Sequence, residues 1–587
     1  LTNEKAYLLG KFARVALGTP HIDYNGRYCM SSAAAAANRA FGIDRGLPFP
    51  VADLADTETL VLWGANPADT MPPLMTWVER RRGALVVVDP RRTATAAVAD
   101  QHLQPVPGSD MAVALGLLRL AWDTDVVDEK YLRARTRGWE EVRDSLGEWT
   151  PEEVERHSGI SPAELRGLLQ ALAQPASAIL LTGRGPEQQS KGVDTVGALI
   201  NLMLALGRVG KPASGWGCLT GQANGQGGRE HGQKADQLPG YRSIDGPLGR
   251  AHVARIWGIR PDELPGAGLS AVEMLAGIGS PGGIRAMVVV GSDVASASPD
   301  ANQVAARLRS LETLAVLDSY MTATADLAGF VLPVAVWAEE EGTLTNLEGR
   351  VLRRRRAVSP PEGVRDDLQV LCALAARLGH AGQFSYSGAE GVYDELRLAS
   401  AGGPADYSGI TYARLDAPGG RSGPGIAWPC PTSDHPGTPR LFESRFAHPD
   451  GRARMVAVAW RPSAEAPDAE FPVWFTTGRL REHYNTGGQT RRIPSLLERA
   501  AEPFLQMHPL LARRVGCVDG EPVLAESRRG RARFRCRVSA DIRPDTVFAP
   551  FHWGGETCAN LLTSPALDPI SRMPEFKVCA VRLVAGE

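Results

Sequence analysis

Residues 59–64 read TLVLWG and continue into ANPADT at 65–70, and this sequence of an apolar run followed by a polar turn decides the fold class. The same pattern returns at residues 84–89 (ALVVVD), 178–183 (AILLTG) and 286–291 (AMVVVG), and LAVLD at 314–318 adds a fifth run. Uninterrupted runs of Val, Leu and Ile are typical of parallel strands buried on both faces, with helices between them completing βαβ units. The sequence therefore predicts an α/β protein of stacked domains built on parallel sheets.

The sequence changes character from about residue 470 onward. FPVWFTTGR (471–479) and DTVFAPFHW (545–553) each predict a strand, and HPLLARRVG (508–516) predicts a short helix ending at Gly516. EPVLAES (521–527) and RARFRCRV (531–538) predict a hairpin. Together they indicate a compact C-terminal β-barrel. Residues 385–465 are rich in Gly and Pro, which predicts an irregular connection.

Composition excludes several classes of protein. The chain has 587 residues, which suggests several domains, and 64 basic residues balance 66 acidic ones to a net charge of −2. This balance gives no reason to expect nucleic acid or a membrane surface as a partner, and no apolar run is long enough to span a bilayer. The eight cysteines form no CxxC pair and no zinc or iron–sulfur pattern, which suits a reducing, cytoplasmic compartment.

The strand-end turns predict a ligand. None of them matches GxGxxG, so a nicotinamide-binding Rossmann domain is a weak hypothesis. All are rich in Gly, Asp, Asn, Ser or Thr, residues that also serve ordinary turns and helix caps. Ligands of parallel sheets bind at the carboxyl ends of the strands, where helix N-termini favour phosphate. Five such turns in one chain indicate a large ligand that bears several phosphates.

Residues 25–40 read NGRYCMSSAAAAANRA and place Cys29 where a loop gives way to an Ala-rich helix, which Ser31 or Ser32 could cap. The start of a helix favours a thiolate, so this position suits nucleophilic attack or metal ligation. A small, buried core cysteine is the alternative interpretation.

Three motifs resemble one family. They are the R-x-C-M-x-S-A context of Cys29, the loop TGQANGQGGREHG (220–232) and the segment FHWGGETCANLLTSPALDPISRMPEFKVCAVRL (551–583). They are similar to motifs of the molybdenum bis(pyranopterin guanine dinucleotide) oxidoreductases, in particular the assimilatory and periplasmic nitrate reductases. The resemblance runs through nearly the whole chain and implies a Mo-bis-MGD cofactor with a double-psi-like C-terminal barrel.

The resemblance implies a reduction of nitrate to nitrite by oxygen-atom transfer. Cys29 would be the thiolate ligand of molybdenum, and Met30 stands where the related formate dehydrogenases typically have His. Arg229 would be the cation that receives nitrate, since a guanidinium fork matches planar oxyanions; a structural ion pair is its alternative role. A formate dehydrogenase, another oxyanion reductase, or a structural subunit without metal are the alternative functions.

The remaining residues that the resemblance implies would hold the two dinucleotides, although any one of them could be a packing residue. One half would use Gly64, Asn66, Asp69, Asp89, Arg91, Gly108 and Asp110. The other would use Gly183, Gly185, Glu187, Gly291, Asp293, Asp318, Ser319 and Asp326. The loop and the C-terminal domain would add Thr220, Gly221, Gln222, Thr477, Gly478, Arg479, His483, Trp553, Asn560 and Lys577.

The expected organisation has four parts. Residues 1–25 with 240–365 form one α/β domain, 26–239 a second that carries Cys29, 366–465 the connecting region and 466–587 the barrel. The family's [4Fe-4S] cluster is expected in the full-length enzyme, but its cysteines are absent here, so we expect an N-terminally incomplete sequence. A flavoprotein, NADH-linked subunit or ferredoxin would supply electrons, and nitrate would be the substrate.

Overall fold

The computed structural model describes residues 1–417 and 425–586, which form two compact units. The first unit comprises residues 1–27, 220–292 and 307–440, and the second comprises 28–219, 293–306 and 441–587. Among the described residues, no helix has the length and apolar character needed to cross a membrane.

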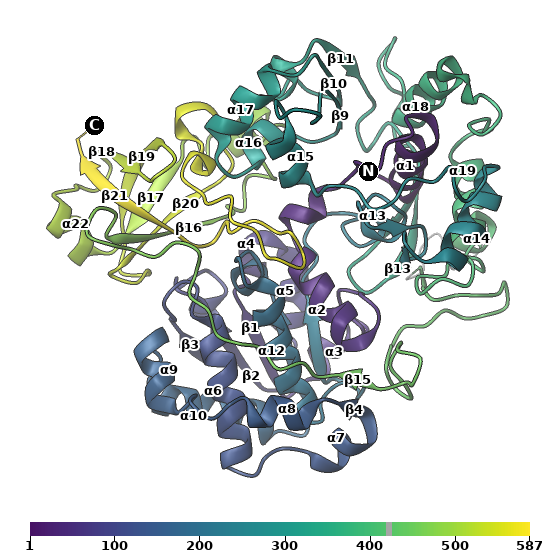
Figure 1. The fold of residues 1–587 in the computed structure, drawn as a ribbon. Helices are drawn as coiled ribbons and strands as arrows, with labels where there is room; N and C mark the ends of the chain where they lie inside the picture. Colours follow the sequence, from purple (N-terminus) through teal and green to yellow (C-terminus); the bar gives the residue numbers. More distant parts are fainter. Residues whose placement is uncertain (418–424, 587) are drawn as a thin grey trace. The chain divides into compact units, whose positions relative to one another are not determined.

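A five-stranded parallel sheet forms the centre of the second unit (Figure 1). Its order is β3-β2-β1-β5-β6, and Thr59 pairs in register with both Ala84 and Ala178. The strands are β1 (Thr59–Trp63), β2 (Ala84–Val88), β3 (Gln101–Leu103), β5 (Ala178–Thr182) and β6 (Gly215–Cys218). All residues of β1 and β5 are buried, which confirms the prediction made from their apolar runs.

Helices cover this sheet. The helix α12 (Gly192–Ala205) is buried along nearly its whole length and packs against α2 (Ser31–Phe41) and α6 (Asp110–Asp123). Further helices of the unit are α5 (Pro72–Val78), α7 (Glu129–Arg135), α8 (Trp139–Asp144), α9 (Pro151–Ser158) and α10 (Pro162–Ala173). The βαβ pattern read from the sequence is therefore present here.

The C-terminal part of the second unit is a closed six-stranded barrel with the order β16-β20-β17-β19-β18-β21 (Figure 1). Phe475, Leu505, Val523, Val547 and Val581 are fully buried in its core. Its strands are β16 (Val473–Gly478), β17 (Phe504–Met507), β18 (Pro522–Glu526), β19 (Arg531–Val538), β20 (Thr546–Pro550) and β21 (Cys579–Ala585). The predicted barrel, its β18–β19 hairpin and the helix α22 (Pro509–Val515), which ends at a left-handed Gly516, are confirmed.

The first unit holds a smaller parallel sheet of order β11-β10-β9, made of β9 (Ala286–Val290), β10 (Thr313–Asp318) and β11 (Phe330–Pro333). Its strands were predicted to be buried on both faces, and this is wrong for β9. Val288 is 42% exposed and Phe330 on β11 is 63% exposed. The apolar cluster around Leu317 and Val370 covers the carboxyl-terminal end of this face, while the other end is open.

The predicted irregular connection over residues 385–465 is also partly wrong. It contains α19 (Ala389–Ser400), α20 (Tyr412–Asp416) and the short strands β14 (Ile426–Ala427) and β15 (Ala453–Arg454). The helix α19 buries Val392, Tyr393 and Leu396, a helical spacing that the surrounding Gly and Pro residues obscured. The Gly-rich part at 418–424 lies outside the described residues.

Other helices of the first unit are α1 (Asn3–Lys11), α14 (Pro247–Trp257), α15 (Ala271–Gly277) and α18 (Asp367–Ala375). The helix α1 packs against α18 and α19. Lys5 on α1 forms ion pairs with Glu340 and Asp367, and its ammonium accounts for the group of carboxylates there that could otherwise resemble a metal site.

Candidate functional site

Three glycines bring two strand-end loops into backbone contact in the second unit. Gly64 follows β1 in the left-handed region, at φ +60, and Gly183 and Gly185 follow β5. A Cβ on Gly64 would lie 2.6 Å from the Cα of Gly185, and one on Gly183 would lie 2.3 Å from the Gly64 carbonyl oxygen. Glycine is therefore required at this carboxyl edge, where main chain packs on main chain.

Several predicted ligand residues at this edge are hydrogen-bonded to other side chains of the protein. Asn66 donates to Asp69 at 2.6 Å, while the Trp63 indole and the Gln189 amide donate to Asp110 at 2.8 and 2.6 Å. These hydrogen bonds hold the strand-end loops in their conformation. In contrast, the buried hydroxyl of Thr182, at the end of β5, has no hydrogen-bond partner in the part of the chain that the structure describes.

Lys577 interacts electrostatically with three arginines and with Asp89, which follows β2. Burial lowers the pKa of Lys577 to about 7; Asp89 opposes this shift, and Arg479, Arg91 and Arg184 reinforce it. Burial also lowers the pKa of Arg91 to about 10 and raises the pKa of Asp89. Around Lys577, three guanidiniums therefore face one carboxylate. An anionic group such as a pyrophosphate would relieve their repulsion.

Cys29 lies in a turn that ends one residue before Ser31, where α2 begins. The prediction that Ser31 or Ser32 caps this helix is wrong: the N-cap is Met30, with no side-chain cap bond. The helix starts earlier than expected, so both serines lie inside its first turn. The Ser32 hydroxyl instead lies 2.9 Å from the Ser571 hydroxyl, within the segment 551–583.

Arg184 was missed by the sequence analysis, although it lies between two glycines that were selected. It belongs to the short helix α11 (Arg184–Glu187), and its guanidinium donates to the Cys29 sulfur at 3.2 Å and the Cys29 carbonyl at 2.7 Å. Burial disfavours its charge, but Glu187, Cys29 and Cys218 outweigh burial and raise the pKa of Arg184. A side chain 155 positions from Cys29 therefore contacts the predicted metal ligand.

The predicted residues of the C-terminal part contact several different segments of the second unit. Thr477 on β16 donates to the Phe576 carbonyl at 3.1 Å and accepts, through its own carbonyl, from Lys577. Arg479 donates to Asn485 at 2.8 Å. Asn560 donates to the Ser296 carbonyl at 2.7 Å, and His483 lies edge-on to Trp553, with ring centroids 5.1 Å apart.

Arg229 lies in the first unit and is fully buried. Its guanidinium donates to the Tyr241 hydroxyl at 2.9 Å, the Gln226 amide oxygen at 2.6 Å and the Gly225 carbonyl at 3.2 Å. Gln226 in turn donates to Glu230 at 2.6 Å, and this carboxylate also accepts from Tyr407. A buried polar network therefore fixes the orientation of Arg229.

The other predicted residues of the first unit lie in its loops. Ser319 donates to the Val334 carbonyl and, through its amide, to Asp318 at the end of β10. Gln222 accepts from Asn25, and Gly291 adopts φ +57 with open space around it. Thr220 and Gly221 lie at the start of the loop 220–232, and Asp326 lies in a short 3-10 helix, Ala325–Leu327. Asp293, which was predicted together with them, belongs to the second unit.

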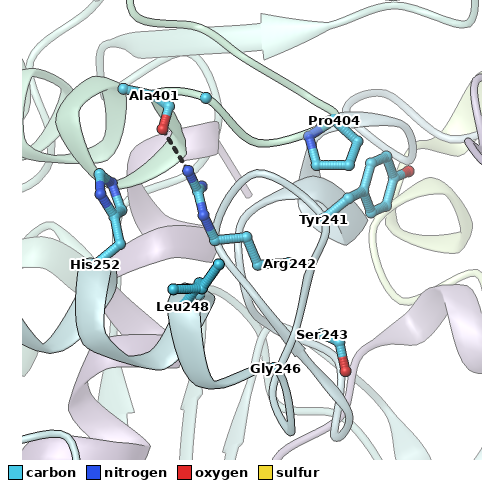
Figure 2. A pocket seen from close by; sticks show the side chains of 10 residues that line it. Tyr241, Arg242, Ser243, Gly246, Leu248, His252, Ala401 and Pro404 are labelled. Carbon is cyan, nitrogen blue, oxygen red and sulfur yellow. Dashed lines mark hydrogen bonds between the residues drawn. The ribbon is translucent and has the colours of Figure 1, made fainter. Parts of the chain in front are cut away.

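A hollow of about 410 Å³ also lies in the first unit, lined in part by Arg242, Leu248, His252 and Ala401 (Figure 2). Arg242 points across it and donates to the carbonyl of Ala401 (Figure 2). It also donates to the Ala399 carbonyl, at the C-terminal end of α19. This guanidinium supports the chain and is not poised for an anion. None of the predicted site residues lines this hollow.

The glycine contacts, the half-buried cation cluster and the closed barrel define a protein that binds a large anionic cofactor, and the chain belongs to the molybdopterin oxidoreductase family. The family model "Molybdopterin oxidoreductase" matches residues 1–377, and "Molydopterin dinucleotide binding domain" matches residues 473–580. The predicted family membership is thus confirmed, and with it an oxidoreductase with a molybdopterin cofactor.

Relatives cover almost the whole chain. The assimilatory nitrate reductase catalytic subunit of Bacillus subtilis (strain 168) is 46% identical over 100% of this chain and 82% of its own length. The F420-dependent formate dehydrogenase subunit alpha of Methanocaldococcus jannaschii is 34% identical over 99% and 84%. Acetylene hydratase from Pelobacter acetylenicus shares the fold, with a TM-score of 0.76 at 17% identity over 99% of this chain and 84% of that one.

Proposed function

We propose that this chain is the catalytic subunit of an assimilatory-type nitrate reductase. The observation that carries the proposal is the position of Cys29, whose sulfur lies in a loop beside the half-buried side chains of Arg184 and Arg479 and is followed directly by Met30. The 46% identity to the nitrate reductase subunit of Bacillus subtilis supports nitrate as the substrate. The lower identity of the formate dehydrogenase relative makes formate the alternative substrate.

The residues of the second unit fit a Mo-bis-MGD group. Lys577, Arg91 and Arg479 would neutralise phosphates. The lowered pKa of Lys577 and of Arg91 supports this role, because a nearby anion would favour the charged form of each side chain. Gly64, Gly183 and Gly185 would let main-chain amides approach the pyrophosphate. Asp89 would accept from the amino edge of a guanine or from a ribose hydroxyl.

Cys29 would supply the thiolate ligand of the metal, since soft thiolates suit such a metal. When bound, the cofactor supplies the two electrons and the Lewis acidity that the reaction needs. Nitrate, two electrons and two protons give nitrite and water. Arg229, held by Gln226 and Tyr241, would orient the planar anion through its guanidinium fork. An electron-donor protein, either a flavoprotein or a ferredoxin, would supply the electrons.

The test is a comparison of substrates on one preparation. The full-length enzyme, purified from cells supplied with molybdate, should form nitrite from nitrate with a reduced viologen as the electron donor. The same preparation from cells supplied with tungstate is the control and should form little nitrite. Formate oxidation by the molybdate preparation, without nitrite formation, would reassign the chain to the alternative.

A further inference from the structure

One guanidinium connects two sulfurs in the second unit. The Nη1 atom of Arg184 donates to the Cys29 sulfur, and its Nη2 atom donates to the Cys218 sulfur, each at 3.2 Å. Both atoms also bind main chain, with the Cys29 carbonyl at 2.7 Å and the Leu219 carbonyl at 2.8 Å. Both terminal nitrogens of the Arg184 guanidinium are therefore held by main-chain carbonyls, and each also contacts a cysteine sulfur.

The surroundings of Arg184 keep this charge effective. Glu187, whose side chain is fully buried, pairs with Nη2 at 3.0 Å and lies on the Cys218 side of the fork. The Arg184 side chain itself is 19% exposed, so water screens its charge only in part. Arg479 adds a second positive charge that interacts with Cys29. Two guanidiniums, those of Arg184 and Arg479, therefore interact with the Cys29 sulfur.

We propose that Arg184 is a positioning residue that holds the Cys29 sulfur and sets the reduction potential of the metal centre through its fixed charge. The inference rests on the proposed ligation of molybdenum by Cys29. A positive charge beside a ligand stabilises the more negative, reduced state of a redox centre. The attraction between the two charges is large when they lie close together and water screens them only in part. Reduction of the centre, which must precede reduction of an oxyanion, is thereby favoured.

The experiment measures the midpoint potential of the molybdenum centre in the holoenzyme by a redox titration that follows its Mo(V) signal, without nitrate. Arg184→Gln should lower the potential enough to change the ratio of reduced to oxidised centre about tenfold at a fixed ambient potential, which corresponds to about 59 mV for one electron. Arg184→Lys keeps the charge and should recover part of this shift. Glu187→Gln removes the countercharge and should move the potential upward.

Arg208→Gln is the matched control, because Arg208 is a buried arginine that donates to the carbonyls of Ala173, Pro175 and Ala176 rather than to a sulfur. It should lower the melting temperature and leave the potential unchanged. An unchanged potential in Arg184→Gln with parental molybdenum content would overturn the proposal. If that variant loses its metal, an unshifted potential in Glu187→Gln overturns it instead. Because no nitrate is present, a failure of the proposed substrate leaves these readings intact.

Discussion

The Nη1 atom of Arg184 lies 3.2 Å from the sulfur of Cys29 and 2.7 Å from the carbonyl oxygen of the same residue. One side chain therefore holds both the reactive atom and the main chain of the proposed metal ligand. The bond to the carbonyl does not depend on the sulfur. The loop should consequently keep its place when the sulfur is replaced, which separates the role of Cys29 in chemistry from any role in folding.

Cys29→Ser is expected to abolish nitrite formation while the cofactor-free protein melts within a few degrees of the parent. A serine alkoxide is harder and far less accessible at neutral pH than a thiolate, and one sulfur contributes little packing. Nitrite assays, molybdenum spectroscopy and thermal melts check this. Cys372→Ser is the control, since Cys372 is also half-buried but lies on α18 in the other unit. A normal metal spectrum in Cys29→Ser would end the assignment.

Arg229→Lys is expected to lower kcat/KM for nitrate about 10-fold or more, about 1.4 kcal/mol, at full molybdenum content. Lysine keeps the charge but loses the planar fork, and it cannot bond to Tyr241, Gln226 and Gly225 at once. Steady-state kinetics on metal-loaded protein measure the effect. Arg414→Lys, which loses a bond to the His435 carbonyl, is the control for a purely structural arginine. Equal kinetics in both variants would make Arg229 structural.

Lys577→Met is expected to stabilise the cofactor-free protein and to weaken retention of the cofactor. Burial lowers the pKa of Lys577 from the ordinary 10.5 of a lysine to about 7 in the folded chain. The unfolded chain therefore binds an extra proton between these values, so the stability of the parent falls as pH is lowered from about 10.5 to 7. Thermal melts across this range should show that the melting temperature of the variant rises relative to that of the parent as pH falls.

The contrast for this prediction is Lys191→Met. Burial lowers the pKa of Lys191 as well, to about 8, and Arg461 adds to this, but Asp110 and Glu575 oppose it. Lys191 also donates to the Arg461 carbonyl at 2.7 Å and lies over the Trp460 ring. Its removal should lower the melting temperature. Lower stability in both variants would show that Lys577 is not an uncompensated buried charge.

The fully buried His552 should make the fold sensitive to acid. The Leu480 amide donates to its Nε2 atom at 2.8 Å, which leaves Nδ1 as the protonated nitrogen facing the Asn485 carbonyl. Burial lowers its pKa to about 3, so the unfolded state binds the extra proton between about pH 6.5 and 3. Stability is therefore lost as pH falls through this window, by up to a few kcal/mol. His552→Gln should melt with a flatter pH profile; an identical slope would contradict this.

Gly64→Ala should unfold far more readily than Gly291→Ala. Both glycines adopt nearly the same left-handed φ, +60 and +57, so the intrinsic backbone strain is about equal, on the order of 1–2 kcal/mol. A Cβ on Gly64 would meet Pro186 and Gly185, whereas one on Gly291 meets nothing within 4 Å. Chemical denaturation of the two variants measures the difference. Equal losses would show that the loops can separate without cost.

The central sheet and the barrel could be predicted because their signals are local. The runs of β1 and β5 are buried on both faces, and β19 alternates between buried and exposed residues, so period and burial agree. The exposure of Phe330 could not be predicted, because whether a second layer covers a strand depends on distant elements. The helix α19 was missed because neighbouring glycines and prolines dominate its window.

The same distinction between local signals and distant contacts applies to the residues of the site. Gly64, Gly183 and Gly185 were selected because the family resemblance assigns these strand-end turns to the dinucleotides, and their close contacts explain why no larger residue fits. Arg184 was overlooked because its importance depends on contacts 155 and 34 positions away, to Cys29 and Cys218. No local pattern reports such a contact. The hydrogen bonds of Asn66, Asp69 and Asp110 to other side chains could likewise be seen only in the structure.

Nitrite formation by the molybdenum-loaded, full-length enzyme tests the central claim most directly. Nitrate and formate should be offered to the same preparation, with molybdenum content measured in parallel and Cys29→Ser prepared alongside. We expect nitrite from nitrate in proportion to the molybdenum bound, little turnover of formate, and neither activity in the variant. Full molybdenum content without nitrite formation, or nitrite formation that survives the loss of the Cys29 sulfur, would contradict the account.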